Sequence, residues 1–155
     1  VVFQSHALMP WMSVIDNVML SAIASGTAFR AARRAAESMI THLGLAAAAD
    51  RDVVALSGGQ RRIVDFARAL VTEAKFLLLD EPTAGVNVAV QATMSKMILH
   101  SGGFGVFFLM IRRPPRSTLF PLVTRVVVMQ AGEVATHGTV AEIRSNAAVI
   151  DAFLR

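Results

Sequence analysis

The chain contains no cysteine and only two lysines, Lys75 and Lys96. Without cysteine it can form neither disulfide bonds nor thiolate metal sites. Neither lysine follows a glycine, so the chain has no phosphate-binding loop of the form G-x-x-x-x-G-K-[ST]. No apolar run approaches the ~18 residues that a transmembrane helix requires, and no secretory signal peptide is recognisable.

The net charge of +4 does not come from a basic face. Three arginines, Arg112, Arg113 and Arg116, lie in one short stretch, and without them 12 basic residues stand against 11 acidic ones. A nucleic-acid-binding surface needs clustered lysine and arginine. The charge pattern therefore argues against a nucleic-acid partner.

Strand-like runs alternate with helical patterns, which predicts an α/β fold with a parallel sheet. Because the chain is 54% hydrophobic, we expect apolar strands buried on both faces, with alanine-rich helices packed against them. The predicted helices are Ser13–Ile23, Ala28–Leu43, Ser57–Glu73, Val88–His100, Thr139–Asn146 and Ala147–Leu154. The predicted strands are Val1–Gln4, Lys75–Asp80, Gly105–Met110, Arg125–Gln130 and Glu133–Thr136, the last two joined by a turn at Ala131-Gly132.

The sequence LSGGQ, Leu56–Gln60, stands at the predicted start of a helix. A serine and two glycines there expose backbone N–H groups at the positive end of the helix, a geometry that binds phosphate oxygens. The alternative is that Ser57 is a plain N-cap after a turn. The pattern alone leaves both readings open.

A second signal is FLLLDEP, Phe76–Pro82, an apolar strand that ends in two acids. Ligands of open α/β sheets bind at the carboxyl ends of the strands. Neighbouring residues of an extended chain point opposite ways, so one carboxylate could hold a Mg²⁺ shell while the other faces a reacting water. The alternative is a strand end with two solvated acids.

The order of these motifs resembles the nucleotide-binding subunit of ABC transporters. LSGGQ is followed by ARAL, by the DEP strand and by TAGVN, and Asp80 follows Gln60 by 20 residues. VFQ at Val2–Gln4 is similar to the glutamine loop of that family, and VVVMQAGEVATHGTVAEI is similar to its terminal hairpin and helix. Only residues 107–124 fall outside the resemblance.

The resemblance implies a partial P-loop NTPase (RecA-like) parallel-sheet core, an α-helical subdomain, and a C-terminal β-hairpin with helices. Residues 1–155 would form one incomplete ATPase domain. Within it, 5–56 would be the mainly helical subdomain and 57–155 the core half with the signature helix, the Walker B strand and the hairpin. The segment that would carry the Walker A motif is expected upstream of Gln4, which implies a chain truncated at its N-terminus.

The resemblance also implies residue roles, with ATP and Mg²⁺ as cofactors. Asp80 would hold the Mg²⁺ shell, Glu81 would be the general base, and Gln4 would contact Mg²⁺ or its water. The signature residues would bind the γ-phosphate of ATP held by a partner subunit, and a D-loop would follow the acids. The signature residues are Ser57, Gly58, Gly59 and Gln60; the D-loop residues are Ala84, Gly85 and Asn87, the last in a position where most family members have Asp.

The implied partners are a second ATPase subunit, identical or different, transmembrane permease subunits, and indirectly a periplasmic or extracellular solute-binding protein. Residues His6–Trp11 would face the permease, unless they form a simple exposed loop. The protein would lie peripherally on the cytoplasmic face of the bacterial inner membrane. The ending AEIRSNAAVIDAFL is most similar to ATPases of branched-chain amino-acid uptake. Urea and short-amide importers are close relatives and stay open as alternatives.

Two further alternatives belong to other classes. A soluble ABC-type ATPase that moves nucleic acid or ribosomes usually carries coiled-coil insertions or tandem cassettes, and neither is visible here. A catalytically dead binding module would have no reason to retain Glu81 and LSGGQ. We therefore expect the ATPase of an importer, with this piece alone inactive.

The stretch FFLMIRRPPRSTLFP, residues 107–121, interrupts the pattern. Its prolines forbid a regular helix. The family's γ-phosphate-contacting histidine is expected near Ile111, yet no histidine lies between His100, at a helix end, and His137, expected in a surface turn. The stretch resembles a peptide translated from sequencing-adapter DNA. The alternative is a basic loop that contacts acidic lipid headgroups, and a genomic read coding through RRPPRST would favour it.

The missing lysine loop generates a testable prediction. The 155-residue chain alone should bind Mg-ATP weakly or not at all, because the donors that cradle the β- and γ-phosphates in cis are absent. Isothermal calorimetry with Mg-ATP measures this affinity. A dissociation constant in the micromolar range would contradict the prediction.

Overall fold

A computed structural model describes residues 8–103, 105–111 and 120–151. They form two compact units, one that ends at Ile111 and one that follows it. The predicted strand Val1–Gln4, with Gln4 itself, and residues 112–119 of the unusual stretch lie outside the described residues. Among those described, no helix is both long and apolar enough to cross a membrane.

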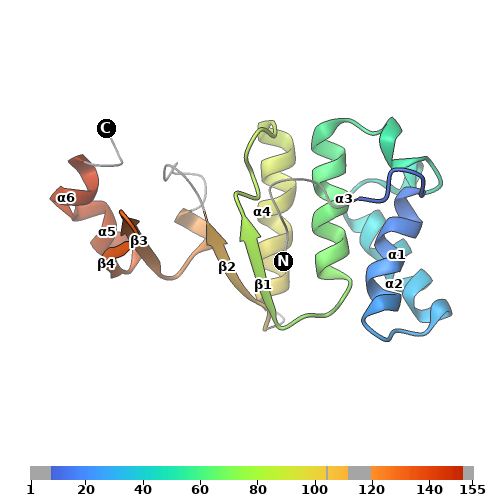
Figure 1. Cartoon of the computed structure of the whole chain (residues 1–155), viewed down its shortest axis with the longest axis horizontal. Coiled ribbons are helices and arrows are strands. Elements are labelled where there is room, and N and C mark those ends of the chain that lie inside the picture. The colour runs from blue at the N-terminus through green and yellow to red at the C-terminus, as the bar shows by residue number, and fades with distance from the viewer. Residues whose placement is uncertain (1–7, 104, 112–119, 152–155) are drawn as a thin grey trace. The chain divides into compact units, whose positions relative to one another are not determined.

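Three helices in the first unit pack on one another, as Figure 1 shows: α1 (Val14–Ala24), α2 (Phe29–His42) and α3 (Gly58–Leu70). These helices confirm the first three predicted from the sequence, although α3 ends three residues earlier than expected. The link between α2 and α3 contains two short 3₁₀ turns, Ala46–Ala48 and Val53–Ala55. The shared core is aliphatic and includes Val14, Val18, Ala36, Ile40, Val64 and Ala67.

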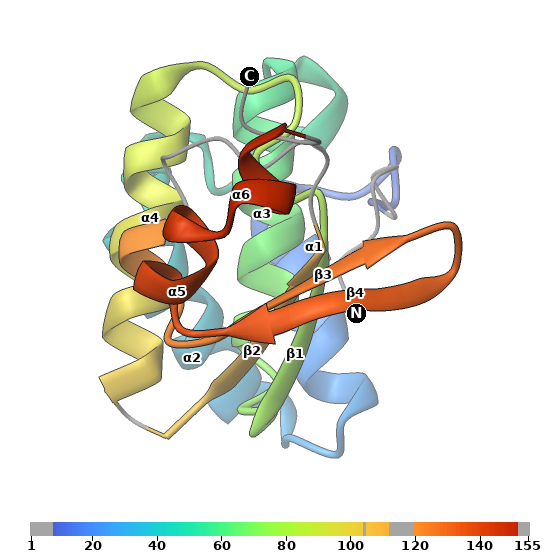
Figure 2. The same ribbon diagram turned by 90° about the vertical axis from the view of Figure 1, so that its left-hand side faces the viewer.

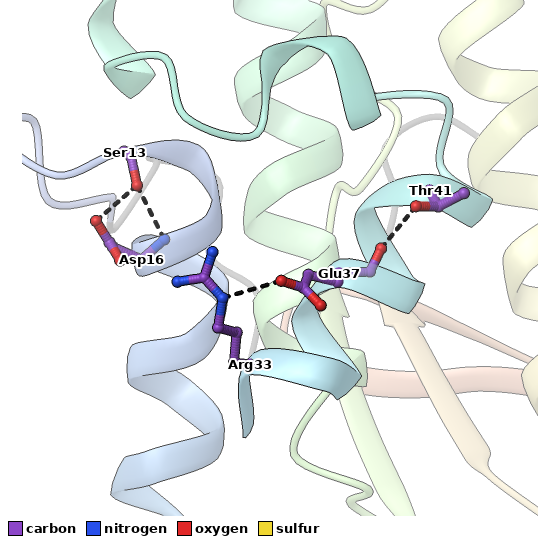
Figure 3. A network of polar contacts seen from close by, with 5 residues as sticks. All are labelled: Ser13, Asp16, Arg33, Glu37 and Thr41. Carbon is purple, nitrogen blue, oxygen red and sulfur yellow. Dashed lines mark hydrogen bonds and ion pairs between the residues drawn. The ribbon is translucent and has the colours of Figure 1, made fainter. Parts of the chain in front are cut away.

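The polar groups of α1 and α2 stabilise the helix start and the solvent face (Figure 3). Ser13 is the N-cap of α1, because its hydroxyl accepts a hydrogen bond from the Asp16 amide at 3.2 Å and donates one to the Asp16 carboxylate at 2.6 Å. On α2, Arg33 and Glu37 form a half-exposed ion pair one turn apart at 2.9 Å. Such exposed pairs contribute at most ~1 kcal/mol, so the apolar core carries the packing.

The parallel sheet contains two strands in the described residues, β1 (Phe76–Asp80) and β2 (Phe107–Ile111), joined through helix α4 (Val88–Gly103). Phe76 pairs with Phe107 and Asp80 pairs with Ile111. Helix α4 contacts both α3 and β2. The predicted α/β arrangement with a parallel sheet is therefore confirmed.

The expectation that the strands are buried on both faces is wrong for the described residues. Leu77 and Leu79 of β1 are buried, but Phe76 on the opposite face is 56% exposed and Phe107 beside it is 70% exposed. Leu109 and Ile111 share that open face. The physical reason is that the residues alternate between two faces, and the helices of this unit cover only one of them.

The predicted boundary between residues 56 and 57 is not marked by a break in packing. Ile63, Val64 and Ala67 of α3 share one core with α1 and α2. The division into a helical subdomain (5–56) and a core half (57–155) stays a prediction.

In the second unit, strands β3 (Val126–Gln130) and β4 (Glu133–Gly138) form the predicted antiparallel hairpin, shown in Figure 2. Both turn residues, Ala131 and Gly132, have positive φ, as a type I′ hairpin turn requires. His137 lies within β4, paired with Val127, so its placement in a turn was wrong, because the ladder continues two residues further than expected. It remains exposed. Helices α5 (Val140–Ser145) and α6 (Ala147–Val149) follow.

Thr139 and Glu142 form the predicted capping box at the start of α5. The Glu142 carboxylate accepts a hydrogen bond from the Thr139 amide at 2.7 Å and another from its hydroxyl at 3.0 Å. The amide bond first, and then the hydroxyl bond, lower the pKa of Glu142 from its ordinary value of 4.5. A Cβ atom at Gly138 would lie 2.6 Å from the carboxylate, so glycine leaves room for the box.

The capping box makes the start of α5 sensitive to acid. Its contribution is present above the ordinary pKa of 4.5 and should be lost as the pH falls through the lowered value, since the protonated carboxyl is a weaker acceptor. Amide shifts of Ala141 and Ile143, followed by NMR through this range, should titrate in the native chain and stay flat in Glu142→Gln. Glu133→Gln is the control, and the amide shifts of Ala141 and Ile143 should still titrate in it. If they do not, the capping box is not the source of the titration.

A close contact joins the first turns of α3 and α4. A Cβ atom built at Gly59 would lie 3.0 Å from Cγ2 of Val90, whereas one at Gly58 meets nothing within 4 Å. Both glycines occupy the first turn of α3, but only Gly59 makes this contact. Glycine at position 59 therefore lets the two helix starts approach.

Alanine substitutions should separate the two glycines. Gly58→Ala should leave stability unchanged or slightly raised, while Gly59→Ala should be less stable than Gly58→Ala by about 1 kcal/mol because of overpacking against Val90. Chemical denaturation measures both. In a Val90→Ala background the difference should disappear; a difference that persists there would exclude the contact as its source.

Candidate functional site

The candidate site lies at the carboxyl ends of β1 and β2 in the first unit. The backbone N–H of Glu81, directly after β1, donates to the carbonyl of Ile111 at 2.9 Å, which continues the ladder by one residue. The position at which the family's histidine was expected, near Ile111, is therefore at the same sheet edge as Asp80. His100 lies on α4 and is exposed, as expected.

The LSGGQ loop forms the N-terminus of α3. Ser57 is the N-cap: its hydroxyl accepts a hydrogen bond from the Gln60 amide at 3.3 Å, and the Gln60 side chain accepts one from the Ser57 amide at 3.0 Å. Ser57 and Gly58 are exposed, and Gly59 is half-buried. Ser57 caps the helix while first-turn amides stay exposed, so an N-cap and a phosphate-binding loop are compatible interpretations of this motif.

Asp80 and Glu81 are both half-buried, but their backbone differs from the expectation. Asp80 ends β1, whereas Glu81 has φ +44°, in the left-handed region. The premise that both acids lie on an extended chain and point opposite ways is wrong, because the chain turns at Glu81. Such a conformation costs a non-glycine residue about 1–2 kcal/mol and persists only where neighbouring contacts impose it.

Arg62 of α3 supplies such contacts. Its Nε donates to the carbonyl of Pro82 at 3.1 Å, and Nη2 donates to the carbonyls of Asp80 at 3.3 Å and Glu81 at 2.8 Å. Arg62 is only 2% exposed. The sequence did not indicate this residue, although it stands four residues before Phe66 on the helix face that becomes buried, an unusual place for a charge.

The residues predicted to form a D-loop follow this turn. The amide of Ala84 donates to the carbonyl of Glu81 at 3.0 Å, and Gly85 has φ +68°. Asn87 accepts a hydrogen bond from the Val90 amide through its side-chain oxygen at 2.9 Å, which caps α4. Asparagine and aspartate are nearly equal as N-caps, so the departure from the family's Asp preserves this local role.

The carboxylate of Asp80 fits a Mg²⁺ ion that is delivered with a nucleotide. Within the described residues there is no group of three or more His, Asp or Glu side chains that could hold a metal. Magnesium is commonly held by one or two carboxylates, phosphate oxygens and water. Asp80 at the strand end matches the carboxylate part of such a shell; Gln4, the other predicted ligand, lies outside the described residues.

The loop before α1 contains the described part of the segment expected to face a permease. Trp11 is 75% exposed. Buried Asn17 fixes the loop behind it: its side-chain oxygen accepts from the Met9 amide at 2.8 Å, and its nitrogen donates to the carbonyls of Met9, Met12 and Ser13. The exposed tryptophan therefore stands on an ordered turn.

The structure thus joins three of the predicted segments and leaves one untested. Arg62 ties α3, which begins with the signature loop, to the Asp80–Pro82 turn, and the close approach of Gly59 to Val90 ties the same loop to the helix after the D-loop. The glutamine loop at Gln4 lies outside the described residues.

Comparisons with known proteins show the family to which the chain belongs. The chain is 36% identical over 143 residues to the spermidine/putrescine import ATP-binding protein PotA of Mesoplasma florum. The aligned region covers 92% of this chain and 41% of PotA. It is 38% identical over 132 residues to the taurine import ATP-binding protein TauB of Pseudomonas aeruginosa. The aligned region covers 83% of this chain and 49% of TauB. The chain thus spans less than half the length of these curated relatives.

Among solved structures, the ATP-binding cassette MJ1267 of an ABC transporter superposes with a TM-score of 0.81 over 97% of this chain and 66% of its own, at 24% identity. This similarity shows the fold: the P-loop NTPase cassette expected from the sequence is confirmed. Residues 1–84 match the sequence profile described as "ABC transporter". The chain belongs to the ABC transporter family, as part of its ATP-binding domain.

Proposed function

We propose that this chain is part of the ATP-binding and ATP-hydrolysing subunit of an ABC importer. One observation carries the proposal: Arg62 of the predicted signature helix donates hydrogen bonds to the turn that contains Asp80 and Glu81. In this function Asp80 contributes a carboxylate to the Mg²⁺ shell, and Glu81 accepts the proton of the attacking water. The names of the relatives, which are import ATP-binding proteins, support the direction of transport.

The signature loop acts on a nucleotide that another subunit holds. Ser57, Gly58 and Gly59 present a hydroxyl and first-turn amides at the positive end of α3, where a γ-phosphate would be favoured, and Gln60 supports the loop through its bond to Ser57. Because this loop would complete a site on another subunit, the proposal includes a dimer of ATPase subunits, with Ala84, Gly85 and Asn87 at the D-loop.

The proposed partners are permease subunits in the membrane, reached by the exposed loop around Trp11, and indirectly a solute-binding protein. The protein would then be peripheral on the cytoplasmic face of the inner membrane. Branched-chain amino acids are the proposed cargo, supported by the ending AEIRSNAAVIDAFL. The relatives named for polyamine and taurine import do not choose among cargoes.

A chimera tests the catalytic part of the proposal. Residues 8–103 of this chain replace the matching segment of the taurine import ATP-binding protein, which supplies the remainder of the cassette. The chimera should hydrolyse ATP with dependence on Mg²⁺, and Glu81→Gln should lower kcat by about 10²–10⁴-fold, the range for loss of a general base. A coupled phosphate-release assay measures this rate.

Glu73→Gln is the matched control, since Glu73 is an exposed acid in the turn after α3 and should not affect the rate. A chimera that folds but hydrolyses no ATP would contradict the proposed function. Equal rates for the native chimera and its Glu81→Gln variant would remove Glu81 from the role of base.

A further inference from the structure

Arg62 places a buried positive charge against backbone carbonyls. Its side chain is 2% exposed and lies in the second turn of α3, five residues after Ser57. A buried guanidinium is tolerated only if its N–H groups find acceptors. The three carbonyls that it reaches belong to consecutive residues, Asp80, Glu81 and Pro82.

These bonds fix both peptide planes that flank the Cα atom of Glu81. The plane before it is held on two sides, because the Asp80 carbonyl accepts from Arg62 and the Glu81 amide donates to the carbonyl of Ile111. The plane after it is held through the Glu81 carbonyl, which accepts from Arg62 at 2.8 Å and from the Ala84 amide at 3.0 Å. With both planes set, the direction of the Cα–Cβ bond of Glu81 is set as well.

The conformation that these bonds hold is one that glutamate does not adopt readily. At φ +44° the Cβ atom crowds the backbone, and the turn would relax without external contacts. The ladder bond to Ile111 restrains only one of the two planes. Arg62 contacts both planes, and it also donates to the carbonyl of Pro82.

We propose that Arg62 is a positioning residue for ATP hydrolysis, which holds the Glu81 turn in the left-handed conformation and so directs the carboxylate that accepts the proton of water. The catalytic part rests on the proposed function, whereas the backbone part does not. Lysine cannot replace this arginine fully, because a single ammonium group cannot match the planar fork that reaches three carbonyls.

The first test uses the 155-residue chain without nucleotide. Positive φ brings the amide proton and Hα of Glu81 close together, which gives a strong intraresidue nuclear Overhauser cross-peak in NMR. The hydrogen bond to Ile111 protects the Glu81 amide from hydrogen exchange. Arg62→Met should abolish the strong cross-peak and lower protection of the Glu81 amide by about 10-fold or more, the factor for one lost charge-assisted hydrogen bond. In Arg62→Lys, the cross-peak intensity and the amide protection of Glu81 should lie between those of the native chain and of Arg62→Met.

Arg68→Met is the matched control, because Arg68 lies on the same helix but its Nε donates to Ser21 of α1 at 3.1 Å. It should leave the Glu81 signals unchanged. The proposal is overturned if Glu81 keeps its cross-peak and protection in a folded Arg62→Met variant. It is equally overturned if Arg68→Met has the same effect, or if neither Arg62 variant folds, since Arg62 would then serve the fold as a whole.

The second test uses the ATPase chimera. Arg62→Met should lower kcat by about 10-fold or more with the KM for ATP little changed, because misplacement of a catalytic group slows chemistry without removing a nucleotide contact. Arg68→Met should leave kcat unchanged. An unaltered kcat in Arg62→Met overturns the positioning role. An inactive parent chimera contradicts the proposed function instead, and the NMR result then decides the backbone part by itself.

Discussion

The first unit depends on the contact between one buried guanidinium and three backbone carbonyls. Helix α3 packs with α1 and α2 on one side, and through Arg62 it holds the end of β1 on the other. Backbone carbonyls accept such bonds whatever side chains follow them, so the contact acts on main-chain geometry.

Local rules were sufficient to locate most elements. Ser13, Ser57 and Thr139 all cap the helices that the sequence predicts, and the alternation of apolar runs and helical spacing gives the parallel sheet. The caps depend on neighbours a few residues away in the chain, and the sheet was predicted from the order of strands and helices along it, so neither prediction required coordinates. The hairpin turn at Ala131-Gly132 is likewise a local feature, since it is defined by the φ angles of these two residues.

The features that could not be predicted depend on distant contacts. The left-handed turn at Glu81 follows a regular apolar strand, and nothing in DEP signals it; Arg62, 19 residues earlier, imposes it. Helical spacing does place Arg62 on the buried stripe with Phe66, but spacing alone does not name its acceptors. The open face at Phe76 and Phe107 could not be read from apolarity either, since strands buried on one face or on two can have the same composition.

The three bonds of Arg62 share one rigid planar group. One side chain therefore donates to the carbonyls of Asp80, Glu81 and Pro82, and its removal takes a donor from all three. Because the helix that carries this side chain begins at Ser57, a single residue connects the predicted signature loop to the backbone that orients Glu81.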